Sequence, residues 1–324
     1  MIIPTITEIQ EARQLMAGSA IRTPLVRLNV LDAPIEIYLK LENLQPIGSF
    51  KIRGATNAMA HMPPEQLARG VLTASAGNMA QGVAWRAREL GIPCTVIAPE
   101  TAPETKIKAI ERLGGRVIKA PFERWWQTFQ ERTYPGIEAT FIHAFDDPYV
   151  MAGNGTIALE ILEDLPDVEA IVIPWGGGGL ACGIAVAVRA LKPACRLYAA
   201  EVATGAPLAA SFEAGSPQTV DYQPSFVDGI GSKTVFPQML ERAQLLLHGV
   251  LVAELAEVAA ALRLLAERNH IIAEGAGACP VACALSGEAR QRKIACVVSG
   301  GNIDLSKLAA LLTDDAIPAH AQPA

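Results

Sequence analysis

One lysine of the sequence stands where its amine could do chemistry. Lys51 follows an apolar segment and a Pro-Ile-Gly-Ser turn within YLKLENLQPIGSFKIRGA, residues 38–55. Ser49 is expected to cap the next helix, which places Lys51 in the first turn, beside the positive end of the helix dipole. There, burial would lower the pKa of the amine and prepare it to act as a nucleophile or base. A solvated amine lying along the surface is the ordinary alternative.

A run of four glycines, Gly176 to Gly179, lies between an apolar strand that ends at Pro174 and a helix expected from residue 180. Glycines at such a joint let backbone N–H groups and a helix start converge on an anion, so the loop predicts a phosphate site. A tight turn without a ligand is the simpler alternative. The segment from Gly176 to Ala181 also fits a loose dinucleotide fingerprint, with Glu201 about 20 residues further on, so an NAD-dependent enzyme is a second interpretation.

Two polar turns could bind other parts of the same ligand. Ser75-Ala76-Gly77-Asn78 follows the strand VLT, and Ser299-Gly300-Gly301-Asn302 follows the strand IACVV. Free N–H groups at a helix start suit a carboxylate, and an asparagine amide can donate to a phenolate oxygen. A phosphate on the glycine loop, an aldehyde on Lys51 and a ring between Asn78 and Ser299 together describe pyridoxal 5'-phosphate.

The composition is that of a globular protein that acts on a small molecule. The 324 residues, 51% of them hydrophobic, can bury a large core in two lobes or domains. The formal net charge is -6 and no block of lysine and arginine occurs, so nucleic acid and membrane are not expected partners. The six cysteines occur singly, as reduced core residues would, and the N-terminus lacks the pattern of a signal peptide. Cytoplasm is the expected compartment.

Segments with strand and helix patterns alternate along most of the chain. In the first half, strands are expected at 71–73, 94–97 and 116–119, with helices at 79–90 and 104–113. In the second half, strands are expected at 170–174, 196–200 and 293–298, with helices at 157–165, 180–191 and 255–268. This alternation predicts an α/β fold of two open lobes with mostly parallel sheets.

A domain boundary is expected near residue 146. There a segment rich in aromatic and turn residues, 121–148, separates the two alternating halves. Residues 66–145 are expected to form a small mobile domain, and residues 1–65 with 146–324 a large domain that binds the cofactor.

Six segments, taken together and in order, resemble the threonine dehydratase and serine racemase group of fold-type II pyridoxal-phosphate enzymes. They are LKLENLQPIGSFKIRGA, TASAGNMAQGVA, AFDDPYVMAGNGT, GGGGL, EGAGA and SGGNID, and the resemblance extends over residues 23–304. It implies a fold like that of the tryptophan synthase β subunit, a pyridoxal phosphate cofactor, an amino-acid substrate and a homodimer. It also implies that Lys51 forms the Schiff base with the cofactor.

The resemblance further implies roles for single residues of these motifs. Phe50 would pack on the pyridine ring, Asn78 would bind its phenolic oxygen, and Ser299 would meet the ring nitrogen. The phosphate would be held by Gly176, Gly177, Gly178 and Gly179. The substrate would bind at the loop of Ser75, Ala76, Gly77, Asn78 and Met79. Glu274 would lie near the cofactor or a cation, or would only cap a helix.

The implied reaction is an elimination from a β-hydroxy-α-amino acid such as threonine, serine or 3-phenylserine, which yields an α-keto acid and ammonia. Lys51 would remove the Cα proton. A serine at the ring nitrogen does not force ring protonation as an aspartate would, so elimination is favoured over transamination. A non-catalytic protein that binds pyridoxal phosphate or an amino acid is the alternative outside enzymes.

Two departures from the group narrow the expected activity. In relatives that racemise amino acids a serine often stands at the position of Ala76, which has no acid or base, so a racemase is not expected. After Glu201 the sequence VATGAP lacks the aspartate that helps to bind a divalent cation in related racemases. A monovalent cation near Glu201 or Glu274 is retained as an alternative.

A third departure concerns the substrate pocket. Relatives commonly have a histidine and a small residue where this chain has Met79 and Trp175. With Phe122, Trp125 and Trp126, these apolar side chains favour a bulky β-substituent, such as the phenyl group of 3-phenylserine. Packing in the core would explain Met79 and the tryptophans equally well.

Overall fold

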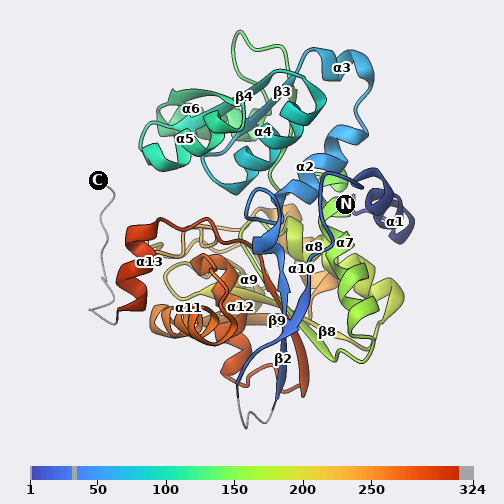
Figure 1. Cartoon of the computed structure of the whole chain (residues 1–324), viewed down its shortest axis with the longest axis vertical. Helices are drawn as coiled ribbons and strands as arrows, with labels where there is room; N and C mark the ends of the chain where they lie inside the picture. The colour runs from blue at the N-terminus through green and yellow to red at the C-terminus, as the bar shows by residue number, and fades with distance from the viewer. Residues whose placement is uncertain (1, 31–34, 314–324) are drawn as a thin grey trace.

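Two sheets organise the chain in the computed structural model, which describes residues 2–30 and 35–313. The larger sheet has the order β1-β2-β10-β7-β8-β9, and the smaller one the order β5-β4-β3-β6. All strand pairs are parallel except that of β1 with β2. The prediction of a two-lobed α/β fold with mostly parallel sheets is therefore confirmed (Figure 1).

The large lobe contains six strands between two layers of helices. The strands are β1 (Leu25–Arg27), β2 (Glu36–Leu41), β7 (Ala170–Pro174), β8 (Arg196–Val202), β9 (Gly249–Ala253) and β10 (Lys293–Val298). One face is covered by α1 (Ile6–Leu15), α7 (Pro148–Asp164), α8 (Gly179–Leu191) and α10 (Pro237–Leu246). The other is covered by α11 (Leu255–Asn269), α12 (Gly275–Leu285) and α13 (Leu305–Leu312), while α9 (Pro207–Ala214) follows β8. Both faces of this sheet are thus buried, as parallel sheets require.

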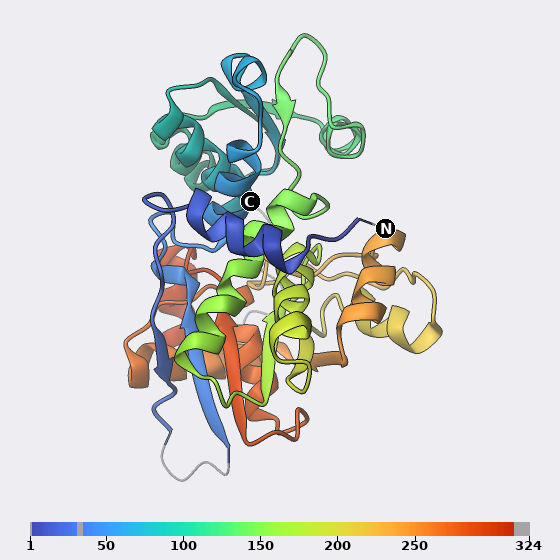
Figure 2. The same cartoon turned by 90° about the vertical axis from the view of Figure 1, so that its right-hand side faces the viewer.

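The small lobe repeats this design with four strands. They are β3 (Val71–Ala74), β4 (Cys94–Pro99), β5 (Arg116–Ala120) and β6 (Thr140–Phe141). Its helices are α3 (Pro64–Ala68), α4 (Asn78–Leu90), α5 (Glu104–Arg112) and α6 (Phe122–Glu131). Figure 1 shows α2 (Lys51–Ala60) and α7 at the junction of the lobes, and Figure 2 shows α1 crossing in front of α7. None of the described helices combines the length and apolarity needed to span a membrane.

Two helix starts differ from their predicted positions. The N-cap of α2 is Phe50 rather than Ser49, whose hydroxyl has no hydrogen-bond partner within the described structure. Helix α7 begins nine residues before the expected start at 157, because the Asp147 side chain accepts the N–H groups of Tyr149 and Val150. The glycines of this first part weaken helix propensity, but Gly153 is needed, since a Cβ there would lie 2.5 Å from the Arg53 carbonyl oxygen.

A buried network of charges fixes the position of α2. The guanidinium of Arg53, which is 2% exposed, donates to Glu42 at 2.8 Å and to Glu160 at 2.7 and 2.9 Å. Lys40 of β2 contacts Glu160 at 2.5 Å. Burial alone would raise the pKa of Glu42, but the charge and hydrogen bonds of Arg53 lower it. Helix α2 is thereby tied to β2, to η1 (Glu42–Leu44) and to α7.

Replacing Arg53 with alanine is expected to lower the free energy of unfolding by about 3–5 kcal/mol, because Glu42 and Glu160 would lose a buried partner. Arg13→Ala is the matched control, since Arg13 pairs with Glu163 at the surface, where such pairs contribute less than about 1 kcal/mol. Urea denaturation followed by circular dichroism measures both changes. Equal losses in the two variants would contradict the role given to the Arg53 network.

Candidate functional site

A cavity of about 370 Å³ lies at the junction of the lobes, where chain segments far apart in the sequence meet. It is lined by the residues that the motifs singled out: Phe50, Lys51, Ser75, Ala76, Gly77, Asn78, Met79, Gly176, Gly177, Gly178, Gly179, Glu274 and Ser299. Parallel strands of both sheets end beside it: β3 of the smaller sheet at Ala74, and β7 and β10 of the larger sheet at Pro174 and Val298. Ligands of open α/β sheets bind outside such carboxyl ends, so the topology itself brings the motifs together.

Four helices begin at the cavity. They are α2 at Lys51, α4 at Asn78, α8 at Gly179 and α12 at Gly275. No side chain caps the first N–H groups of α2, α4 or α8. Unpaired N–H groups and the positive ends of the helix dipoles favour bound anions. The cavity is therefore suited to a ligand with phosphate or carboxylate groups.

The amine of Lys51 points into this positive environment. Its Nζ donates to the Ala144 carbonyl oxygen at 2.8 Å and lies 5.1 Å from the centroid of the Phe50 ring. Burial lowers the pKa of the amine from 10.5 to about 8, and the charge of Glu274 offsets part of this effect. A lysine that loses its proton near neutral pH is suited to act as a nucleophile or base.

The glycine loop has no room for side chains. A Cβ on Gly177 would lie 2.0 Å from Cδ1 of Phe145, and Gly178 has φ of 89°, in the left-handed region. The loop therefore passes close to Phe145 and presents backbone rather than side chains to the cavity. Together with the uncapped start of α8, this forms a cradle that fits a phosphate group.

Hydrogen bonds join the two polar turns. Asn302 donates to Oδ1 of Asn78 at 2.8 Å and to the Ile47 carbonyl oxygen at 2.9 Å, while Asn78 donates to Oε1 of Glu274 at 2.8 Å. The Phe50 N–H donates to the Ser299 carbonyl oxygen at 3.0 Å. Burial raises the pKa of Glu274 to about 8, because it disfavours the charged form of the carboxyl group.

Several residues around the cavity were not anticipated from the sequence. Phe145 lines it against the glycine loop, and Lys106 of α5 pairs with Asp228 at 2.8 Å across the two lobes. The segment 121–148, which indicated a domain boundary, contains Phe145, but no local pattern shows which loop the Phe145 ring will contact. His143 fixes the turn that contains Phe145, because its Nδ1 accepts the N–H groups of Phe145 and Asp146, and burial lowers its pKa to about 3.

Glu201 lies away from the cavity. Its two carboxylate oxygens accept the N–H groups of Leu208 and Ala209 at 3.0 and 2.8 Å, and burial raises its pKa to about 7. It therefore caps α9 and does not face the glycine loop. Binding the ribose of a dinucleotide would require the carboxylate to face that loop. Among the described residues, no group of three or more His, Cys, Asp or Glu side chains is placed to hold a metal ion.

Trp175 does not line the ligand cavity. It is 1% exposed, and its ring packs beneath the glycine loop, where a Cβ on Gly178 would lie 2.4 Å from it. Of the two interpretations left open for Trp175, the structure supports packing in the core, because its side chain is buried and does not line the cavity. Met79 does line the cavity and is also buried.

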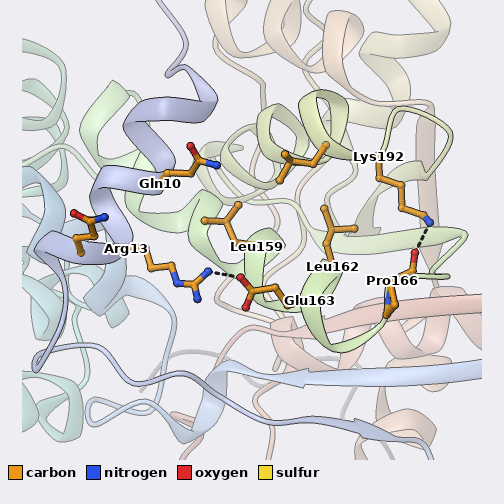
Figure 3. A pocket seen from close by; sticks show the side chains of 9 residues that line it. Gln10, Arg13, Leu159, Leu162, Glu163, Pro166 and Lys192 are labelled. Atoms are coloured by element: carbon orange, nitrogen blue, oxygen red, sulfur yellow. Dashed lines mark hydrogen bonds and ion pairs between the residues drawn. The ribbon is translucent and has the colours of Figure 1, made fainter.

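A second hollow of about 650 Å³ opens on the outer side of the large lobe, between α1, α7 and α8. Figure 3 shows Arg13 paired with Glu163 and Lys192 bonded to the Pro166 carbonyl oxygen along this groove. Its charged groups are thus already partnered and partly exposed, and none of the motif residues lies in it. The cavity with Lys51 is the better candidate for a functional site.

Comparisons with known proteins agree on one family. Residues 17–300 match the family model described as pyridoxal-phosphate dependent enzyme. L-threonine ammonia-lyase of Thermotoga maritima is 41% identical over 312 residues, which cover 94% of this chain and 77% of that protein. The structure of maize serine racemase has a TM-score of 0.89 at 32% identity, covering 96% of this chain and 98% of the other. The serine racemase of Dictyostelium discoideum has a TM-score of 0.85 at 31% identity, with 93% and 99% covered.

In the protein without ligand, labelling of Lys51 by an amine reagent is expected to reach half its maximum near pH 8, because the amine is neutral above its pKa of about 8. Exposed lysines ordinarily lose their proton only near pH 10, so the other labelled lysines serve as the control. Pulse labelling followed by peptide mass spectrometry measures each site. A Lys51 profile that coincides with the exposed lysines would contradict the environment described for it.

Proposed function

Because the chain belongs to the family of pyridoxal-phosphate dependent enzymes, we propose that it is an ammonia-lyase acting on a β-hydroxy-α-amino acid. A substrate such as threonine or serine would lose its β-hydroxyl and its amino group, yielding an α-keto acid and ammonia. The observation that carries the proposal is the amine of Lys51, whose pKa is lowered to about 8 in a cavity that also contains a phosphate cradle.

The residues around the cavity offer a partner to each part of pyridoxal phosphate. Its phosphate would bind the backbone of the loop from Gly176 to Gly179, and its ring would lie against Phe50. Asn78 has a second amide hydrogen for the phenolic oxygen, because one is already donated to Glu274. The neutral hydroxyl of Ser299 would face the ring nitrogen, and Lys51 would bond the aldehyde carbon.

Pyridoxal phosphate, when bound, supplies an electron sink that stabilises negative charge at the Cα of an amino acid. The loop from Ser75 to Asn78 would hold the substrate carboxylate with the N–H groups at the start of α4. Lys51, once free to act as a base, would take the Cα proton, which a pKa near 8 allows at neutral pH. Ala76 lines the same cavity and has no group to return a proton, so elimination rather than racemisation is proposed.

Further features are proposed from the sequence and the geometry. Residues 66–145 would move as a small domain against 1–65 and 146–324, with the pair of Lys106 and Asp228 joining the lobes in the closed arrangement. The protein would act as a homodimer in the cytoplasm, where its six buried, unpaired cysteines would stay reduced. A monovalent cation near Glu201 or Glu274 is proposed as an additional ligand that the reaction does not require.

Lys51→Ala is expected to lower the rate of keto-acid release from threonine by at least about a thousandfold, because it removes both the covalent attachment and the base. It should also abolish the visible absorbance that pyridoxal phosphate acquires when a lysine binds it. Ultraviolet-visible spectra and a coupled keto-acid assay measure the two effects. Lys106→Ala, which removes the other lysine lining the cavity, should keep the absorbance.

Wild-type protein that takes up no pyridoxal phosphate would disprove the assignment of the cofactor. Protein that binds it but releases no keto acid from any β-hydroxy-α-amino acid would instead favour a non-catalytic binding protein.

Gly177→Ala is expected to weaken the binding of pyridoxal phosphate by at least about tenfold, because the added methyl group would overlap with Phe145 and displace the loop. Phe145→Ala should restore part of the affinity in the double variant, since it removes the overlapping ring. Equilibrium titration followed by absorbance gives the dissociation constants. An unchanged constant in Gly177→Ala would show that the loop does not hold the phosphate.

A further inference from the structure

A larger cavity, of about 810 Å³, lies next to the candidate site and is assigned no part in the proposed function. Its walls come from both lobes: α6 of the small lobe, and the segment 229–236 of the large lobe. Ser75, Phe145, Gly176 and Gly177 line both cavities. The larger cavity therefore adjoins the site around Lys51.

Aromatic rings form a connected wall of this cavity. Phe122 packs on Trp125 at 5.5 Å between ring centroids, Trp126 stacks on Phe129 at 5.7 Å, and Phe129 lies 5.6 Å from Phe145. Phe236 of the large lobe completes the wall, at 5.9 Å from Trp126 and 5.5 Å from Phe145. The wall begins at the exposed Phe122 and ends at Phe145, beside the glycine loop.

The chemistry of the wall selects for flat apolar groups. Offset and edge-to-face contacts between rings stabilise an added aromatic ring beyond the burial of its surface. None of the residues lining this cavity is a carboxylate, and its one charged side chain, Lys233, is exposed to solvent. The polar groups of the lining, such as the hydroxyls of Tyr222, Ser232 and Thr234, are few beside the aromatic rings, so a charged or strongly hydrated substituent would lose more water there than it would gain in partners.

The aromatic cavity shares residues with the two loops that are proposed to hold the substrate carboxylate and the phosphate. Ser75 belongs to the loop proposed to hold the substrate carboxylate, and it also lines the aromatic cavity. Gly176 and Gly177, proposed to hold the phosphate, form the other shared edge. An amino acid bound between these two edges would have the aromatic cavity beside it.

We propose that this aromatic cavity binds the β-substituent of the substrate, and that the preferred substrates are β-hydroxy-α-amino acids with an aryl group on the β-carbon. The proposal rests on the ammonia-lyase function proposed above and specifies its substrate class. Threonine, with a methyl group, would leave most of the cavity unfilled, whereas a phenyl ring would contact Trp125, Trp126 and Phe236.

The test compares the wild-type holoenzyme on 3-phenylserine and threonine, in both β-configurations, with keto-acid release as the readout. We expect kcat/KM for one configuration of phenylserine to exceed that for threonine by at least about tenfold. Phenylserine turned over no faster than threonine would overturn the substrate class and leave the ammonia-lyase function standing. No release from any substrate would overturn the proposed function itself.

Binding is tested separately with amino acids that carry no β-hydroxyl. L-phenylalanine is expected to bind the holoenzyme at least about tenfold more tightly than L-alanine by calorimetry, because only the former has a ring for the cavity. Equal affinities would overturn the inference even where no substrate is turned over. This measurement needs no catalysis, so it keeps the two proposals distinguishable.

Variants of the aromatic wall test whether its rings cause the preference for phenylserine over threonine. Trp125→Leu and Phe122→Ser are expected to lower kcat/KM for phenylserine at least about fivefold more than for threonine. Trp85→Leu is the matched control, because Trp85 is a half-buried tryptophan of α4 that lines neither cavity. Since Phe122 is 61% exposed, its loss should not impair folding. An equal loss for both substrates in both variants would overturn the assignment of this wall.

Discussion

The position of the Lys51 amine depends on one buried cation, the guanidinium of Arg53. Its fork is shared between Glu42 and Glu160, which lie on η1 and α7. Helix α2 cannot slide or turn without breaking these charged contacts, and Lys51 is its first residue. A buried network of this kind adds little net stability compared with apolar packing, so its value here is that it specifies one arrangement.

The fixed start of α2 meets three other helix starts, and this convergence decides the electrostatics of the cavity. Burial disfavours a charged amine, so the pKa of Lys51 is lowered to about 8, although the charge of Glu274 offsets part of this effect. Burial also raises the pKa of Glu274 to about 8, which disfavours a negative charge beside an anionic ligand. The same field therefore prepares the amine for reaction and favours phosphate and carboxylate groups.

The two cavities are lined by different elements of the fold. The groups proposed for chemistry come mainly from helix starts and strand ends, whereas the aromatic wall is built largely on α6 of the small lobe and completed by Phe236. Phe145 belongs to both, since its ring fills the space above the glycine loop and continues the aromatic wall. A shift of the small lobe would thus change the fit of the substrate side chain and the geometry at the amine together.

The amino-acid sequence by itself was enough to predict the α/β class, the mostly parallel sheets and the motifs that line the cavity, because strand ends, glycine loops and helix starts are local patterns. The same patterns misplaced the cap of α2 and the start of α7, where Gly153 and Arg53 approach each other over a long sequence separation. Tertiary structure alone decided that Trp175 faces the core, that Glu201 caps α9, and that Phe145 contacts the glycine loop. These outcomes depend on which distant segments pack together, and no local spacing of residues records that choice.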